Sequence, residues 1–183
     1  FFILYHKKME LIKNQRIDNI LGSVDIDIKS SMIWDVISSP GVLKKCHPFC
    51  QDNVVLNWCG AGSEDVINYY NGLTLNRYFT KWEAGKGFEL LIGNNTYATA
   101  KVNWEITPLN SNRSNLSIHI EVFSDIALKK FYLPLRILIK YLYFLPNMKK
   151  YIQSVVLGVK YYIESNSSVK KNQFGYNKMF STK

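Results

Sequence analysis

The chain has 183 residues, of which 47% are hydrophobic and 14% aromatic, and its formal net charge is +9. This length fits one domain, or one domain with extensions, and the composition allows a sizeable core. Cys46, Cys50 and Cys59 are odd in number and clustered, which argues against the disulfide framework of a small secreted protein. We therefore expect a cytoplasmic protein with free thiols.

The positive charge is confined to the last third of the chain. Residues 1–126 carry 12 Lys and Arg against 13 Asp and Glu, whereas residues 127–183 carry 11 against 1. Such asymmetry indicates either attraction to an anionic partner or a solvated helix face followed by a basic tail. At the other end, five apolar residues precede two lysines, which is the reverse of a signal peptide. We expect Met9 to be the true initiator and residues 1–8 to be a non-native or mis-set start.

A strand and a helix open the body of the chain. Residues 20–28 place isoleucine and valine on one side and Asp25 and Asp27 on the other, which predicts a half-buried strand. Met32–Ile37 follows a pair of serines suited to a helix N-cap, and Pro40 with Gly41 ends this helix.

Six further strands are predicted by short segments separated by turns rich in glycine and asparagine. They are Asn53–Trp58, Glu64–Asn71, Leu73–Trp82, Gly87–Ile92, Tyr97–Thr107 and Ser114–Phe123. In the clearest segments apolar and polar residues alternate, so one face is covered and the other faces water. Ala98 and Ala100 are small and would leave room on the covered side of the sheet.

The cover is predicted to be a helix over Asn147–Glu164. Its apolar residues recur at the spacing of one helix face for four turns: Met148, Tyr151, Ile152, Val155, Val159, Tyr162 and Ile163. Gly158 interrupts a helix interior at a cost of about 1 kcal/mol. It either lets the helix approach the sheet closely or leaves space for a ligand.

The order of these segments resembles the START-like, or SRPBCC, superfamily over about residues 17–165. The likeness rests on a strand, then Ser-Ser-Met-Ile-Trp-Asp-Val-Ile-Ser-Ser-Pro-Gly at Ser30–Gly41, His47-Pro48-Phe49, a long meander, and the helix from Tyr151 to Tyr162. The superfamily includes polyketide cyclase/dehydrase-like proteins, and the tail near Lys171–Gly175 is similar to that of an uncharacterised bacterial branch. The resemblance implies an α+β helix-grip fold: a curved seven-stranded antiparallel sheet wrapped around the long C-terminal helix, over a deep apolar cavity.

An additional segment, Ala127–Leu145, precedes this last helix. Pro134 suits a first helical position, and Pro146 is expected to stop the helix. Leu135, Leu138 and Leu142 mark one apolar face, and Ile137 and Tyr141 mark a second. Either both faces are buried, or the helix forms a cavity lid or a surface for a membrane or a partner subunit.

The resemblance implies a single domain over 9–165 with a basic tail at 166–183. It also implies an apolar pocket, which is the usual form of a small-ligand site. The ligand-binding residues expected around it are Trp34, His47, Phe49, Tyr70, Phe79, Phe88, Leu90, Trp104 and Tyr151. Each also has an alternative reading as plain core.

Catalytic and metal-binding signals are sparse. The spacing of Cys46, His47 and Cys50 fits no standard zinc arrangement, so we expect no metal and no cofactor. His119 and Glu121 share the polar face of their strand, away from the predicted cavity, and we expect no catalytic residue there. The aromatic residues among the lysines of the tail have no basic sheet face to extend a nucleic-acid groove, so no nucleic-acid partner is expected.

We expect a protein that binds a small hydrophobic molecule of lipid, polyketide or isoprenoid type, and we lean away from an enzyme. The first alternative is a cyclase/aromatase-type enzyme that uses the same cavity, with His47 or a tyrosine as acid/base. The second is a membrane-peripheral lipid-handling factor. In that case Arg136, Lys140, Lys149 and Lys150 would supply weak, salt-sensitive contact with anionic membranes.

Overall fold

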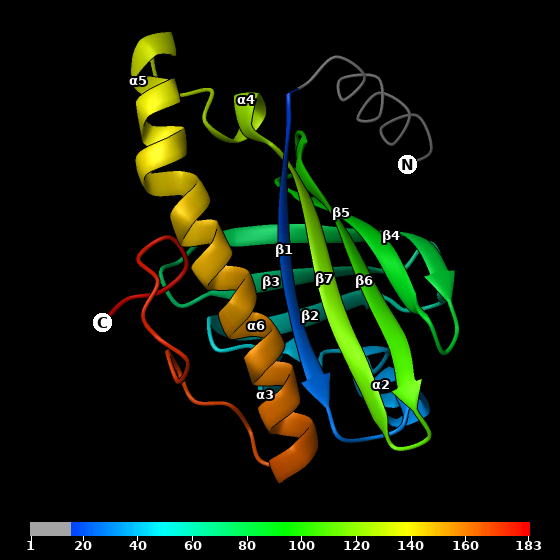
Figure 1. Ribbon diagram of the computed structural model, residues 1–183. Helices are drawn as coiled ribbons and strands as arrows, with labels where there is room; N and C mark the ends of the chain where they lie inside the picture. Colours follow the sequence, from blue (N-terminus) through cyan, green and yellow to red (C-terminus); the bar gives the residue numbers. More distant parts are fainter. Residues whose placement is uncertain (1–15) are drawn as a thin grey trace.

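The computed structural model describes residues 16–183 (Figure 1). The predictions for residues 1–8 and Met9 lie outside the described residues. The strands are β1 (Ile17–Ile26), β2 (Cys50–Asn57), β3 (Glu64–Tyr69), β4 (Thr74–Glu83), β5 (Gly87–Gly93), β6 (Ala98–Asn110) and β7 (Arg113–Phe123). The helices are α2 (Ser30–Ile37), α3 (Leu43–Cys46), α4 (Ser124–Ala127), α5 (Leu133–Ile139), the π-helical turn η1 (Lys140–Phe144) and α6 (Leu145–Ser165).

The strands form one antiparallel sheet in the order β1-β7-β6-β5-β4-β3-β2. Inward and outward residues alternate in β6 and β7, as the sequence pattern predicted. The pairing register shifts within β4–β5, β5–β6 and β2–β3, and such bulges bend a sheet. The bent sheet wraps around α6 in Figure 1, which confirms the predicted α+β helix-grip fold.

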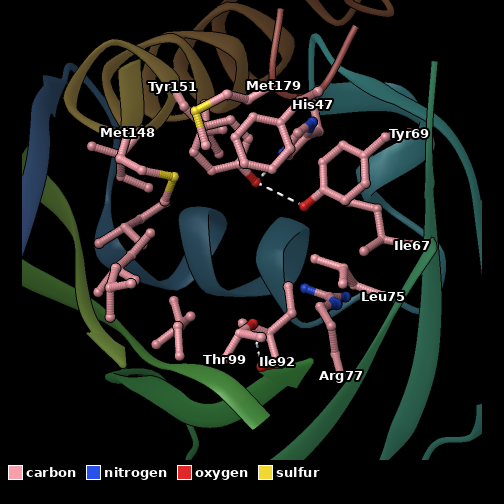
Figure 2. A pocket seen from close by; sticks show the side chains of 18 of the residues that line it. His47, Ile67, Tyr69, Leu75, Arg77, Ile92, Thr99, Met148, Tyr151 and Met179 are labelled. Atoms are coloured by element: carbon pink, nitrogen blue, oxygen red, sulfur yellow. Dashed lines mark hydrogen bonds between the residues drawn. The ribbon is translucent and has the colours of Figure 1, made fainter. Parts of the chain in front are cut away.

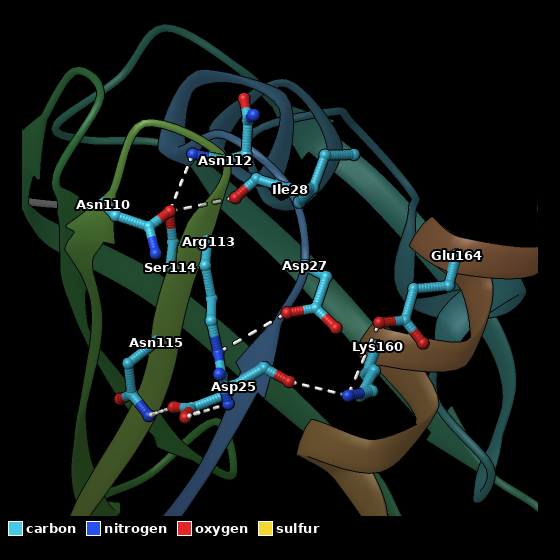
Figure 3. A network of polar contacts seen from close by, with 10 residues as sticks. All are labelled: Asp25, Asp27, Ile28, Asn110, Asn112, Arg113, Ser114, Asn115, Lys160 and Glu164. Carbon is cyan, nitrogen blue, oxygen red and sulfur yellow. Dashed lines mark hydrogen bonds and ion pairs between the residues drawn. The ribbon is translucent and has the colours of Figure 1, made fainter.

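Helix α6 packs on the concave face of the sheet and against β1. Ile152, Val156 and Val159 are fully buried there. Close approach to β1 is possible because Gly22 has no side chain: a Cβ at this position would lie 3.0 Å from the Ile152 side chain. At the far end of α6, Lys160 Nζ donates to the Asp25 carbonyl at 2.7 Å (Figure 3).

The prediction that Pro146 stops a helix is wrong, because α5, η1 and α6 form one continuous helix of 33 residues. A proline inside a helix removes one N–H and crowds the carbonyl four residues earlier. Here the turn before the proline widens to π geometry, and the Leu145 N–H bonds to the Lys140 carbonyl. Widened turns of this kind are a recognised way to carry a helix past such a defect.

The two apolar faces predicted for the segment around α5 are not buried. Within Leu133–Ile139 no side chain is buried, and in η1 the buried residues are Lys140 and Phe144. Leu142 is 72% exposed and Leu138 is 54% exposed. In Figure 1 this part of the helix stands away from the sheet. The interpretation in which both faces are covered by the rest of the domain is therefore wrong.

The tail after α6 folds back along the helix toward the sheet (Figure 1). Val169 N–H donates to the Lys45 carbonyl, and Asn71 Nδ2 donates to the Met179 carbonyl at 2.8 Å. Phe180 is 7% exposed. Tertiary contacts thus fix a segment whose sequence suggested only a basic extension.

Candidate functional site

A cavity of about 260 Å³ lies between the concave face of the sheet and α6. The sheet contributes apolar side chains such as Leu90, Ala100 and Trp104, and α6 contributes Met148 and Ile152. Lining residues that keep some exposure, including Leu73 and Met179, lie near the start of β4 and the end of the tail. The wall is therefore mostly hydrocarbon, with polar groups at a few defined points.

The main polar group is a chain of three side chains, His47, Tyr151 and Tyr69 (Figure 2). His47 follows the last residue of α3 in an extended conformation, which turns its ring toward α6. His47 Nε2 lies 3.0 Å from Tyr151 Oη, and Tyr151 Oη lies 3.0 Å from Tyr69 Oη. All three side chains are buried.

The backbone determines which nitrogen of His47 carries the proton. The Phe49 N–H donates to Nδ1 at 3.1 Å, so Nδ1 is an acceptor. A neutral imidazole then carries its proton on Nε2 and donates it to Tyr151 Oη.

With this tautomer, one phenolic proton is left over. The two phenols have two protons, and the hydrogen bond between Tyr69 and Tyr151 uses one of them. The other belongs to no hydrogen bond within the chain of three groups. Because both hydroxyls line the cavity, the cluster offers the cavity one O–H donor.

Burial keeps these groups neutral. It lowers the pKa of His47 to about 3, and the positive charge of Arg77 lowers it further in the same direction. Burial also raises the pKa of Tyr151 to about 12 and raises the pKa of Tyr69 well above its ordinary value. At neutral pH the cluster therefore acts as a set of hydrogen-bonding groups without charge.

One charged pair adjoins this cluster. Arg77 Nε donates to Asp65 Oδ1 at 2.7 Å, and Arg77 Nη2 bonds to the second carboxylate oxygen. Asp65 is completely buried and Arg77 is 6% exposed. Burial opposes the charge on Arg77, but Asp65 raises its pKa above the ordinary value. Arg77 lines the cavity, so its guanidinium contributes positive potential to the wall (Figure 2).

Two residues of the tail complete the wall. Met179 and Phe180 both line the cavity. The Phe180 ring lies 4.1 Å from the Tyr151 ring and 5.0 Å from the Tyr69 ring, measured between centroids. The tail therefore covers the side of the cavity that holds the polar cluster.

Of the nine predicted ligand-binding residues, four line the cavity: His47, Leu90, Trp104 and Tyr151. The other five lie elsewhere. Phe49 stacks behind Tyr151, at 5.6 Å between centroids. Phe79, Phe88 and Trp34 belong to an aromatic cluster around Trp82, and Tyr70 lies beside Lys171.

Sequence reasoning missed Tyr69, Arg77, Met179 and Phe180. The adjacent tyrosines 69 and 70 left the strand parity open, and β3 turns Tyr69 inward. Arg77 is a charged residue within a strand, and the pairing of Asp65 opposite it across β3–β4 shows why it is tolerated there.

The other candidate groups lie away from the cavity or lack a shared site. Cys46 and Cys50 are buried, and burial raises the pKa of each to about 12, whereas Cys59 is exposed. His119 bonds to Asn19 on the outer face of the sheet at 3.0 Å.

Residues 16–183 hold no cluster of three or more His, Cys, Asp or Glu arranged for a metal ion. In the same range, no helix combines the length and the apolar character that crossing a membrane requires.

No family model and no curated protein matches the chain by sequence. Solved structures match its fold. The Zhui aromatase/cyclase from Streptomyces sp. R1128 has a TM-score of 0.60 at 11% identity, over 84% of this chain and 100% of that one. The Aha1 dimer from Colwellia psychrerythraea gives 0.59 at 14% identity, over 80% and 96%. Norcoclaurine synthase from Thalictrum flavum, in complex with dopamine and hydroxybenzaldehyde, gives 0.55 at 11% identity, over 84% and 90%. These likenesses show that the chain shares the fold of these proteins, an antiparallel sheet wrapped around a long C-terminal helix.

Proposed function

We propose that the chain binds one small hydrophobic molecule that carries a hydrogen-bond acceptor. The observation that carries the proposal is an apolar cavity whose buried tyrosine pair holds one O–H donor with no partner among residues 16–183. A buried donor without a partner costs about 1–3 kcal/mol. A ligand carbonyl or ether oxygen at this point removes that cost, whereas a purely hydrocarbon ligand leaves it in place.

The volume of the cavity sets the size of the bound part. An apolar cavity of about 150 Å³ holds benzene, so 260 Å³ corresponds to about ten non-hydrogen atoms. A bicyclic ring or a ten-carbon segment fills this space. A longer lipid, polyketide or isoprenoid would place its remainder at the mouth or displace the tail at Phe180.

The cyclase/aromatase alternative receives less support from the same geometry. A general base must have a free lone pair near neutral pH. His47 Nδ1 already accepts from Phe49 N–H, Nε2 is bonded to Tyr151, and burial depresses the pKa of the ring. These contacts favour binding over proton abstraction by His47.

The test uses two probes of equal shape, 1-indanone and 1-methyleneindane, which differ in having C=O or C=CH₂ at one position. Titration calorimetry should show binding of the ketone, and the carbonyl stretch of ¹³C-labelled ketone should shift to lower frequency on binding. Ala100→Phe should fill the cavity and weaken binding at least tenfold. Asn103→Phe, on the outer face of β6, is the matched control and should leave binding unchanged.

Equal affinity of wild type and Ala100→Phe would overturn the cavity as the binding site. Ketone binding with an unshifted carbonyl stretch would leave a hydrophobic site but remove the acceptor requirement. Native mass spectrometry of the purified protein identifies any natural ligand that stays bound.

A further inference from the structure

The helical segment Leu133–Tyr143 presents most of its apolar side chains outward and its charged side chains inward. The exposed apolar residues are Leu133, Leu135, Ile137, Leu138, Tyr141, Leu142 and Tyr143. This is the reverse of an ordinary surface helix, whose apolar stripe faces the core.

Two ion pairs hold the segment in this orientation. Lys140 Nζ lies 2.6 Å from Asp18 Oδ2, and Lys140 is only 9% exposed. Arg136 lies 3.7 Å from Asp125 and donates to the Phe131 carbonyl at 3.3 Å. Both basic side chains therefore point toward the body of the protein. Rotation of the helix to bury its leucines would break these contacts.

The charge around this apolar face is of one sign. Between residues 126 and 163 the sequence contains no Asp or Glu. Lys130 stands exposed before the segment, and Lys149 and Lys150 stand exposed after it. Asp125 and Asp18 each form an ion pair with a basic residue of the segment, Arg136 and Lys140 respectively.

We propose that this face, the exposed apolar side chains of the segment with Lys130, Lys149 and Lys150 at its ends, docks onto an anionic lipid surface. Apolar side chains would enter the headgroup boundary while lysines contact lipid phosphates. Two copies of the chain joined through the same face would bring their lysines together, so charge favours lipid over self-association. The 12 residues of α5 and η1 span about 18 Å, so the segment lies along the surface and does not cross it.

Docking would also bring the cavity to the membrane. Ala127 precedes the segment and Phe144 ends it, and both line the cavity. A hydrophobic ligand would then pass between lipid and cavity beside this helix. The exposed face would dock in the same way with or without a ligand in the cavity.

The experiment measures co-sedimentation of the full chain with vesicles of phosphatidylcholine, with or without 30% phosphatidylserine, at low and high salt. We expect binding to the anionic vesicles that weakens as salt rises. Each leucine withdrawn from water contributes about tenfold or more to affinity. Leu138→Ser/Leu142→Ser should therefore weaken binding at least tenfold. The matched control Leu21→Ser/Leu56→Ser removes two leucines that are equally exposed on the sheet, and should change it less than twofold.

A second pair of variants tests the charge. Lys149→Gln/Lys150→Gln should weaken binding to anionic vesicles and flatten its salt dependence, while Lys45→Gln/Lys86→Gln, exposed elsewhere, should not. Absence of binding to both vesicle types at low salt overturns the proposal. So does equal loss in the leucine variants and their control. A dimer in sedimentation equilibrium that Leu138→Ser/Leu142→Ser converts to monomer, without vesicle binding, would make the face a self-association surface instead.

Discussion

Gly158 of α6 lies against the backbone of Cys46, so closely that a Cβ on the glycine would stand 2.3 Å from the Cys46 carbonyl oxygen. This contact joins α6 to the end of α3, and His47 follows directly in the chain. Two helical turns earlier, Tyr151 reaches the His47 ring. The sequence left two roles open for Gly158, close approach to the sheet or space for a ligand, and the structure shows a third. At Gly158 the helix approaches the Cys46 backbone and the Pro48 ring, and this contact sets the position of the polar cluster.

Gly158→Ala should destabilise the protein although alanine is the better helix former. The helix propensity gain is about 1 kcal/mol. The added methyl group meets a backbone oxygen that cannot rotate away, and such overpacking typically costs about 1–3 kcal/mol. Urea denaturation should show a net loss of up to about 2 kcal/mol. Gln153→Ala, exposed on the same helix, should be neutral or slightly stabilising. A Gly158→Ala variant at least as stable as wild type would contradict the close packing.

Some residues of the site could be predicted from the sequence pattern, and others could not. The period-two pattern of β6 identified Trp104, and the helical pattern of α6 identified Tyr151, because each element buries one regular face. Strand β3 breaks that regularity. Its inward residues are Asp65, Ile67 and Tyr69, so a carboxylate occupies a core position. Only the partner on the next strand, Arg77, makes this arrangement stable, and a single strand's pattern cannot show that pairing.

The tail and α5 could not be derived from local patterns for different reasons. Phe180 has no periodic apolar neighbours in the sequence, and its place is fixed by rings distant along the chain, Tyr69 and Tyr151. In α5 the pattern was read correctly as apolar, but its orientation depends on where Asp18 and Asp125 lie in space. Both outcomes are determined by tertiary contacts rather than by propensity.

His47 should make stability depend on pH in acid. Its pKa is about 3 in the folded protein, against about 6.5 in an unfolded chain. Below pH 6.5 the unfolded chain takes up a proton that the folded protein does not. Stability is therefore full above pH 6.5 and falls by about 1.4 kcal/mol per pH unit as pH drops toward 3. Chemical denaturation between pH 7 and 4 measures this slope.

The contribution of His47 is isolated by comparing variants. His47→Gln should have a smaller slope than wild type between pH 6.5 and 4, because carboxylate titration is common to both proteins. Identical slopes in wild type and His47→Gln would show that the imidazole is not held neutral by burial.

Breaking the Asp65–Arg77 pair should strongly lower the free energy of unfolding, whereas replacing both residues with apolar ones should lower it little. Arg77→Met leaves the Asp65 carboxylate buried without its cation, which typically costs about 3–5 kcal/mol. Adding Asp65→Val removes the unpaired charge and should recover most of the loss. Thermal and urea denaturation of the two single variants and the double variant give the coupling energy. Lys81→Met, at an exposed ion pair, should change stability little. Additive losses in the double variant would contradict a coupled buried pair.

Phe180 should control access to the cavity from the side of the tail. Its ring packs on Tyr151 and Tyr69 and forms part of the wall. The N–H groups of Phe180 and Ser181 both donate to the Asn177 carbonyl within the tail, so their hydrogen exchange reports local opening of this turn. Phe180→Ala removes a contact worth about 3 kcal/mol, enough for more than a tenfold rise in local opening. Exchange at the Ser181 amide should accelerate at least tenfold, and bound 1-indanone should dissociate faster by a similar factor in stopped-flow measurements.

Tyr176→Ala, on the exposed side of the same tail, should leave both rates unchanged. If exchange accelerates in Phe180→Ala while the dissociation rate of the ketone stays the same, the ligand leaves by another route and the tail is only a structural cover.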